Sequence, residues 1–186
     1  ARVVRQSPLM LGAYREKDTY VKKIAIVMGS KSDLEKAKAA TEILEKFGVP
    51  YAVRVLSAHR TPDEAAEFAR SARSNGFAAI IAVAGKAAHL GGVLAAATTL
   101  PVIALPVSTS FLDGLDSVLS ILPMPSGVPV AVMGVNAGAN AGLFCVRVLA
   151  ATDNKLDKKY AEYVENMRKS TLADDAAVCA QFNGDN

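Results

Sequence analysis

Five short apolar runs, separated by longer segments of helical periodicity, organise the chain from residue 23 onward. Each run is almost uninterrupted in apolar residues, which is typical of strands covered on both faces. The segments between them place apolar side chains on one side only, which predicts helices. The predicted strands are 23–28, 51–56, 78–83, 101–106 and 129–134, and the predicted helices are 33–47, 62–75, 88–98, 115–122 and 137–150.

Five successive strand–helix units predict a parallel sheet joined by right-handed crossovers. The fold class is therefore α/β, a three-layer doubly wound sandwich with a flavodoxin-like five-stranded sheet. For this fold we expect the strand order 2-1-3-4-5.

One more helix is predicted over residues 153–169, after the sheet is complete. Its apolar stripe must dock either on its own domain or on another subunit. We expect a single catalytic α/β domain over 23–170 that includes this helix, an N-terminal arm or cloning remnant over 1–22, and a loose tail over 171–186. The stripe consists of Leu156, Tyr160, Tyr163, Val164 and Met167.

Composition narrows the classes of function. The 186 residues are 51% hydrophobic and 21% charged, with a net charge of +3 and scattered basic residues, which argues against nucleic-acid binding. No apolar run approaches the roughly 20 residues that span a bilayer, so we expect no membrane partner. Cys145 and Cys179 lack zinc-binding spacing and are read as reduced thiols of a cytoplasmic protein.

Ligands of open parallel sheets bind beyond the carboxyl ends of the strands, so five loops are candidates for the site. Both histidines of the chain, His59 and His89, fall in these loops. In strand order the loops read "GSKSD", "SAHRT", "AGKAAHLGG", "VSTSFLDG" and "VNAGAN".

The first loop combines a glycine turn with a helix start. Ser32 and Glu35 fit a capping box, and Gly29 permits a tight turn. Backbone N–H groups at such a helix start, with the hydroxyls of Ser30 and Ser32, form a candidate anion site. Helix capping alone explains these residues equally well.

The second loop, "SAHRTPDE", divides into two parts. Residues 61–64 fit a second capping box with proline at the first helical position. Ser57, His59 and Arg60 are not explained by helix formation. Arginine is suited to phosphate, and histidine is suited to proton transfer near neutral pH, although a solvated loop would also accept both residues.

The third and fourth loops carry weaker signals. Gly85 and the glycines after His89 allow close approach of a ligand. Capping the helix or filling space is the alternative role of His89, which ranks below His59 as the proton carrier, and Asp113 is expected to cap the helix after the fourth loop. The sequence shows no nucleophile elbow, metal cluster or catalytic carboxylate pair. The residues thus favour a phosphate-binding pocket with a histidine acid/base.

Six segments between residues 23 and 155 together resemble N5-carboxyaminoimidazole ribonucleotide mutases, the class I enzymes of the PurE family. They occur in the family's order and spacing. They are "VMGSKSD" (27–33), "SAHRTPD" (57–63), "AAHL" (87–90), "LPV" with "DGLDSVLSI" (105–121), "MPSGVPVA" (124–131) and "NAGANAGL" (136–143).

The resemblance implies a flavodoxin-like homo-octamer of purine biosynthesis that acts on a small ribonucleotide. Its reaction moves a carboxyl group from the exocyclic nitrogen to ring carbon 4, without metal or organic cofactor. His59 is implied to be the general acid/base. The implied substrate-binding residues are Ser30, Asp33, Ser57, Arg60, Gly29, Ser32, Ala58, Gly85, Lys86, Ala87, His89 and Leu90.

Two positions depart from the mutase pattern "GGAAHLPG". Lys86 replaces a glycine and Gly91 a proline. A basic residue at position 86 is typical of the related class II carboxylases, which use aminoimidazole ribonucleotide and CO2 directly. Arg60, Pro62 and His89 favour the mutase. The alternatives are the direct carboxylase and, from another class, a non-catalytic flavodoxin-like module that binds a nucleotide.

Overall fold

The sheet is parallel throughout and has the strand order β2-β1-β3-β4-β5, which confirms the predicted topology. The computed structural model describes residues 22–183, so the predicted arm over 1–22 lies almost wholly outside the described residues. The strands are β1 (Lys23–Met28), β2 (Tyr51–Val55), β3 (Phe77–Gly85), β4 (Val102–Val107) and β5 (Ala131–Val132).

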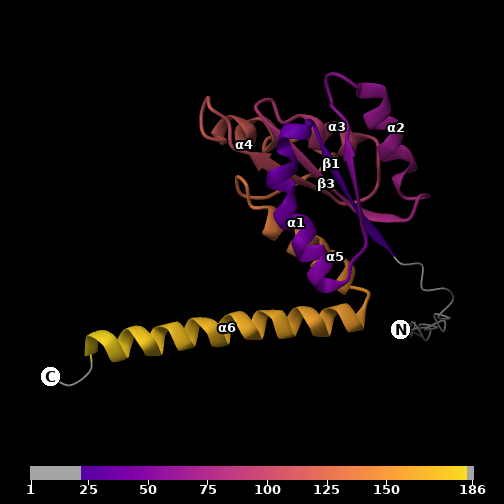
Figure 1. Cartoon of the computed structure of the whole chain (residues 1–186). Helices are drawn as coiled ribbons and strands as arrows, with labels where there is room; N and C mark the ends of the chain where they lie inside the picture. Colours follow the sequence, from indigo (N-terminus) through magenta and orange to yellow (C-terminus); the bar gives the residue numbers. More distant parts are fainter. Residues whose placement is uncertain (1–21, 184–186) are drawn as a thin grey trace, which may run out of the picture.

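Helices cover both faces of this sheet (Figure 1). One layer contains α1 and α5, and the other contains α2, α3 and α4. The helices are α1 (Leu34–Phe47), α2 (Pro62–Ala72), α3 (Leu90–Ala96), α4 (Leu115–Ile121), α5 (Gly138–Ala150) and α6 (Asn154–Asn183), and a 3-10 turn, η1 (Lys31–Asp33), precedes α1.

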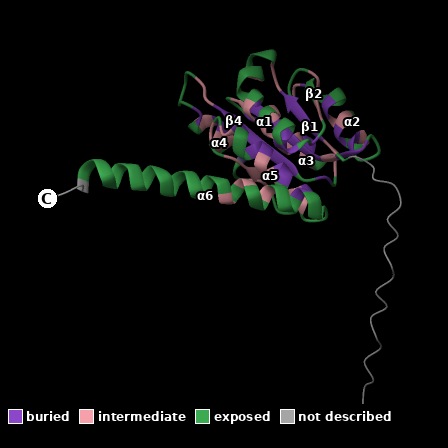
Figure 2. Ribbon diagram, turned by 60° about the horizontal axis from the view of Figure 1, so that its bottom comes forward, coloured by how far each residue is buried: buried purple, intermediate pink, exposed green. Residues whose placement is uncertain are grey.

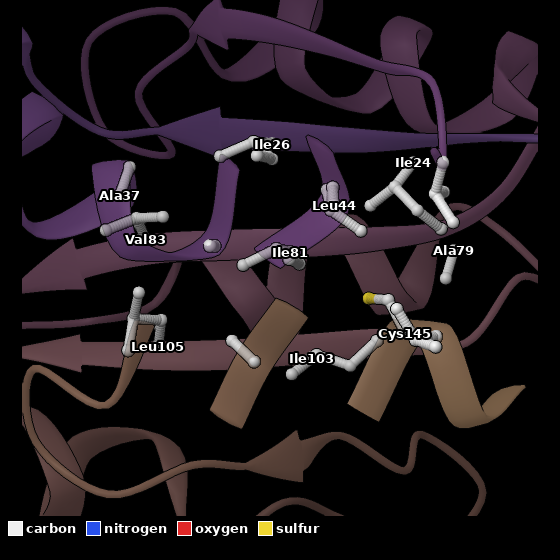
Figure 3. Packing of buried hydrophobic residues seen from close by; sticks show 14 of the residues in the cluster. Ile24, Ile26, Ala37, Leu44, Ala79, Ile81, Val83, Ile103, Leu105 and Cys145 are labelled. Carbon is white, nitrogen blue, oxygen red and sulfur yellow. The ribbon is translucent and has the colours of Figure 1, made fainter. Parts of the chain in front are cut away.

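The core is two apolar clusters separated by the sheet, because successive strand residues point to opposite faces. On the α1/α5 face, Ile26, Ile81 and Ile103 of the three central strands pack with Leu44 of α1 and Cys145 of α5 (Figure 3). Burial raises the pKa of the Cys145 thiol to about 12, so the group stays protonated and acts as an apolar side chain.

Helices α1 and α5 approach one another closely, and glycine makes this possible. A Cβ atom at Gly138 would lie 2.7 Å from the carbonyl oxygen of Lys36, closer than any side chain tolerates. This contact fixes the start of α5, and hence the loop between β5 and α5, beside the sheet.

Strand β5 is shorter than the predicted 129–134. It pairs with β4 only at Ile103 and Ala104. Pro129 has no N–H group to donate, and beyond the strand the chain follows β4 through single bonds, from Met133 N to the oxygen of Ala104 (2.9 Å) and from Asn136 N to that of Pro106 (2.9 Å). The apolar run over 129–134 therefore predicted a longer strand than the structure forms.

The predicted helix caps at Ser32 and Asp113 are wrong. Ser32 and Glu35 do not form a capping box, because the helix is entered through η1, where Ser30 is the N-cap and accepts a bond from Ser32 N (3.3 Å). Likewise Asp113 does not cap α4. Gly114 occupies the N-cap position with φ 96°, and Asp113 is itself left-handed with φ 50°.

Helix α6 continues to Asn183 instead of ending near residue 170 in a loose tail. Its first turns dock on the domain, where the ring of Phe47 lies 5.5 Å from that of Tyr163. Beyond this contact the helix leaves the domain and is exposed (Figure 2). The segment 171–183 contains four alanines and neither glycine nor proline, which favours continued helix. None of the described helices is both long and apolar enough to cross a membrane.

Candidate active site

A cleft of about 610 Å³ lies at the carboxyl ends of β1, β2, β3 and β4. Every predicted substrate-binding residue except His89 lines it, together with His59. The structure thus brings three separate motifs of the sequence to one place. The lining residues are Gly29, Ser30, Ser32, Asp33, Ser57, Ala58, His59, Arg60, Ala84, Gly85, Lys86, Ala87, Leu90, Val107, Ser108, Thr109 and Ser110.

The loop after β1 supplies hydroxyls and a carboxylate. The Ser32 hydroxyl lies 2.9 Å from Ser30 Oγ and 3.4 Å from Asp33 Oδ1. Partial burial raises the pKa of the Asp33 carboxyl, and this effect outweighs the opposing influence of the Ser32 and Ser30 hydrogen bonds and of the Arg60 charge. As a member of the cleft lining, the Asp33 carboxyl group offers oxygen atoms that can accept hydrogen bonds from a bound ligand.

The loop after β2 is held by bonds within itself. Thr61 is the N-cap residue of α2, but the predicted capping box does not form, because the Thr61 hydroxyl contacts Ser57 instead. Ser57 N donates to Thr61 Oγ1 (2.8 Å), and that hydroxyl reaches the carbonyl oxygen of Ser57 (3.2 Å). Arg60 then joins this loop to the first, donating from Nη2 to the carbonyl oxygen of Gly29 (2.6 Å).

The turn after β3 has an unusual backbone. Lys86 adopts φ 58°, a left-handed conformation that favours glycine, the residue of the mutase pattern at this position. The turn is anchored from outside by α4: the Ser120 hydroxyl accepts a bond from Ala88 N (2.9 Å) and lies 3.1 Å from the oxygen of Lys86. Gly91, the second departure, brings α3 against α4, since a Cβ there would lie 3.3 Å from Cδ1 of Ile121.

The two histidines of the chain form a pair. His59 Nε2 lies 3.0 Å from His89 Nδ1, and the rings meet edge to face with centroids 5.1 Å apart. His89 occupies the N-cap position of α3 without capping it, so its ring is directed to His59 and not to the helix. One imidazole must donate and the other accept, which couples the proton of His59 to His89.

Sequence reasoning named the loop after β4 as a candidate but singled out none of the residues with which it lines the cleft. These residues are Val107, the last residue of β4, and 108–110, and Ala84 near the end of β3 also lines the cleft. The available signal was the polar run "STS" at the carboxyl end of a buried strand. Ser108 is held by a distant side chain, donating from N to Asn136 Oδ1 (3.1 Å) and accepting from Asn136 Nδ2 at its hydroxyl (2.9 Å).

Helix α4 also holds the loop after β4 in place. Thr109 Oγ1 lies 2.9 Å from Asp116 Oδ2, and the buried hydroxyl of Ser117 donates to the carbonyl oxygen of Val107 (2.9 Å). Within residues 22–183, no group of three or more His, Cys, Asp or Glu side chains is arranged to hold a metal ion. The arrangement combines an imidazole pair, a group suited to proton transfer, with cationic and hydroxyl groups suited to a phosphate.

Comparison with known proteins matches residues 23–170 to the family model described as AIR carboxylase. An N5-carboxyaminoimidazole ribonucleotide mutase of Bacillus subtilis is 51% identical over 151 residues, which are 80% of this chain and 93% of that protein. A chloroplastic phosphoribosylaminoimidazole carboxylase of Vigna aconitifolia is 49% identical over 149 residues, which are 80% of this chain but only 27% of that protein.

A solved structure has the same architecture. The crystal structure of Treponema denticola PurE superimposes with a TM-score of 0.78 at 27% identity, and the match covers 84% of this chain and 98% of that one. The family match ends at residue 170, so the last turns of α6 lie beyond it.

Proposed function

Since the chain belongs to the AIR carboxylase family, we propose that it converts N5-carboxyaminoimidazole ribonucleotide to 4-carboxy-5-aminoimidazole ribonucleotide in purine biosynthesis. Support comes from relatives that carry the mutase name and are matched over most of their length. The observation that carries the proposal is the cleft itself, where His59, the member of the imidazole pair that lines it, faces the same space as Asp33 and Arg60.

Substrate binding is assigned by chemistry. The Asp33 carboxyl accepts hydrogen bonds from the ribose hydroxyls, whereas Arg60 and Ser57 face the phosphate. The hydroxyls of Ser30 and Ser32 and the backbone at Gly29 and Ala58 complete that side. Gly85, Lys86, Ala87, His89 and Leu90 enclose the carboxyl group. The common cleft and the short contacts that hold its loops support these roles for every residue except His89, whose role is supported by its contact with His59.

His59 moves the proton in both halves of the proposed reaction. It donates a proton to the exocyclic nitrogen as the carbon–nitrogen bond breaks, which releases CO2 and aminoimidazole ribonucleotide within the cleft. Ring carbon 4 then attacks CO2, and His59 removes the proton from that carbon, which restores the aromatic ring. The cleft must retain CO2 between the two steps, because escape would leave the ribonucleotide uncarboxylated.

A paired-substrate assay tests this proposal. Purified protein is given either the N-carboxylated ribonucleotide or aminoimidazole ribonucleotide with bicarbonate, and formation of the 4-carboxy product is followed by its absorbance. We expect rapid turnover of the first substrate and slow turnover of the second. Turnover of the second substrate alone would overturn the mutase proposal in favour of the direct carboxylase, and turnover of neither would favour the non-catalytic module.

The direct carboxylase is kept as the second candidate because of one residue. Lys86 is exposed at the cleft and places a basic side chain where the mutase pattern has glycine. Relatives named carboxylase from Vigna aconitifolia and Schizosaccharomyces pombe share 49% identity with the chain, although the chain spans only 27% of each.

We also propose that the protein works as a cytoplasmic homo-octamer. Support for assembly comes from large apolar side chains that remain exposed on α4 and on either side of it, including Phe111 (78% exposed) and Leu122 (59%). Both cysteines are free, which suits a reducing compartment. Light scattering of the purified protein tests the octamer, and a monomer at micromolar concentration would contradict it.

A further inference from the structure

Ser120 is a half-buried serine of α4 that does not line the cleft. Its helix is fixed to the sheet one turn earlier, where the buried Ser117 hydroxyl donates to the carbonyl oxygen of Val107 (2.9 Å). The position of Ser120 is therefore set by the core and not by the loops. From this position its hydroxyl reaches the turn after β3, 34 residues earlier in the chain.

The hydroxyl contacts the turn in two ways. It accepts a hydrogen bond from the backbone N–H of Ala88 (2.9 Å), a buried residue, and its single proton is shared between the carbonyl oxygens of Lys86 (3.1 Å) and of Ser117 in its own helix (3.0 Å). Lys86 is the residue with the left-handed backbone (φ 58°). Because a non-glycine residue adopts this conformation only when its surroundings enforce it, the Ser120 contacts hold the turn in its shape.

The held turn leads directly to His89. His89 follows Ala88, and its backbone N–H donates to the carbonyl oxygen of Ala87 (2.8 Å), so the direction of its side chain is determined by the turn. That side chain then meets His59, with 3.0 Å between His89 Nδ1 and His59 Nε2. An unbroken series of short contacts thus runs from α4 to the imidazole pair.

We propose that Ser120 is a positioning residue that sets the His59–His89 contact by fixing the turn over residues 86–88. The consequence for catalysis rests on the proposed function, in which His59 transfers the proton. A displaced turn leaves the ribose and phosphate contacts at Asp33 and Arg60 intact, loosens the contacts that Lys86 and Ala87 make around the carboxyl group, and changes the orientation of the proton carrier. The effect is therefore expected to be much larger in kcat than in KM.

The kinetic test compares Ser120→Ala with Ser120→Thr, which keeps a hydroxyl. We expect Ser120→Ala to lower kcat at least tenfold with KM changed less than threefold, and Ser120→Thr to restore most of the loss. Ser71→Ala is the matched control, because Ser71 is a half-buried helical serine that bonds only the backbone of its own helix α2. A kcat within twofold of wild type for Ser120→Ala would overturn the proposal.

A second measurement needs no substrate. Because the chain has only two histidines, the imidazole NMR signals of the ¹³C-histidine-labelled protein come entirely from this pair. We expect Ser120→Ala to shift the signals of both rings, and Ser71→Ala to shift neither. Unshifted signals contradict the positioning role even if activity falls. Conversely, shifted signals in a protein that turns over no ribonucleotide support the contact and reject the proposed function instead.

Hydrogen exchange of the unaltered protein covers the case in which Ser120→Ala does not fold. The Ala88 amide lies outside any helix or strand, so its protection depends on the bond to Ser120. We expect Ala88 to exchange at least 100-fold more slowly than an unbonded amide, and free exchange would overturn the proposal.

Discussion

The two walls of the cleft are built differently. The loops after β1 and β2 are held by hydrogen bonds within and between these two loops. Ser30 bonds to Ser32, Ser57 to Thr61, and Arg60 of the second loop to Gly29 of the first. The loops after β3 and β4 are held from outside, through Ser120 and Asp116 of α4 and through Asn136 beyond β5. We call them the first wall and the second wall.

This difference separates two ways of placing functional groups. The first wall needs only its own sequence and the parallel order of β1 and β2, so a change there has a local effect. The second wall depends on how α4 and the β5–α5 loop pack on the sheet, so changes outside the cleft reach it. The histidine pair spans the two walls, with His59 on the first and His89 on the second.

The largest difference between the two walls is expected in the loss of kcat when the histidine of each wall is replaced. His59→Asn should lower kcat about 10²–10⁴-fold, because it removes the proton carrier, with little change in stability since the side chain is exposed. His89→Asn should lower kcat by a smaller factor, because it removes only the side chain that contacts the proton carrier His59. Steady-state kinetics with thermal unfolding as the control measure both. A larger loss for His89→Asn would reverse the assignment of the proton carrier.

A change in the second wall should reduce stability as well as activity. Asn136 has φ 57° and makes two hydrogen bonds to Ser108. Asn136→Ala should lower the free energy of unfolding by about 1–3 kcal/mol, since it loses the bonds and strains the backbone. Asn136→Gly also loses the bonds but relieves the backbone strain, so it should lower the free energy of unfolding by less. Urea unfolding of the wild type and both variants measures these free energies. Equal stability of the Ala variant and the wild type would contradict the role of Asn136 in holding Ser108.

A change in the first wall should be milder. Thr61→Val keeps the shape of the side chain but removes the hydroxyl that contacts Ser57 N and O. We expect a loss of about 1 kcal/mol in the free energy of unfolding, together with a raised KM if Ser57 faces the phosphate. Thr61→Ser, which keeps the hydroxyl, serves as the control and should resemble wild type in both measurements.

The smallest effect concerns Asp33 and depends on pH. Burial raises its pKa, so folding favours the protonated carboxyl, and the stability from this preference is lost as pH rises through the folded-state pKa. Asp33→Asn should therefore be more stable than wild type at pH 7, while binding substrate less well. The difference in the free energy of unfolding between Asp33→Asn and the wild type should disappear as the pH falls below about 4, the ordinary pKa of an aspartate carboxyl group. A gap that widens at low pH would show the opposite shift.

The first wall could largely be predicted from the sequence. Ser57, His59 and Arg60 stood out because helix formation did not require them, and the structure places all three at the cleft. The prediction that the Thr61 hydroxyl caps α2 was wrong, because this hydroxyl contacts Ser57 instead. Both contacts use the same hydroxyl, and the local sequence pattern does not distinguish between them. The substrate roles of these residues stay predictions.

The second wall could be predicted only in part. Lys86 and His89 were singled out, but the pairing of His89 with His59 was not, and Ser108 and Thr109 were missed. Helix α6 was expected to end near residue 170 because its apolar stripe weakens there, whereas its alanine-rich continuation keeps the helix to Asn183. Neither Ser120 nor Asn136 shows any local sign of bracing a loop.

By itself, the sequence determined the parallel sheet, its strand order and the edge at which the cleft lies, because strand burial and short crossovers leave a local and periodic signal. Only the tertiary structure decided the second wall. Its contacts with Asn136 and Ser120 join residues 28 to 34 positions apart, and the histidines are 30 apart. Hydrogen bonds over such separations depend on how helices pack against the sheet, and no pattern within a single segment records that packing.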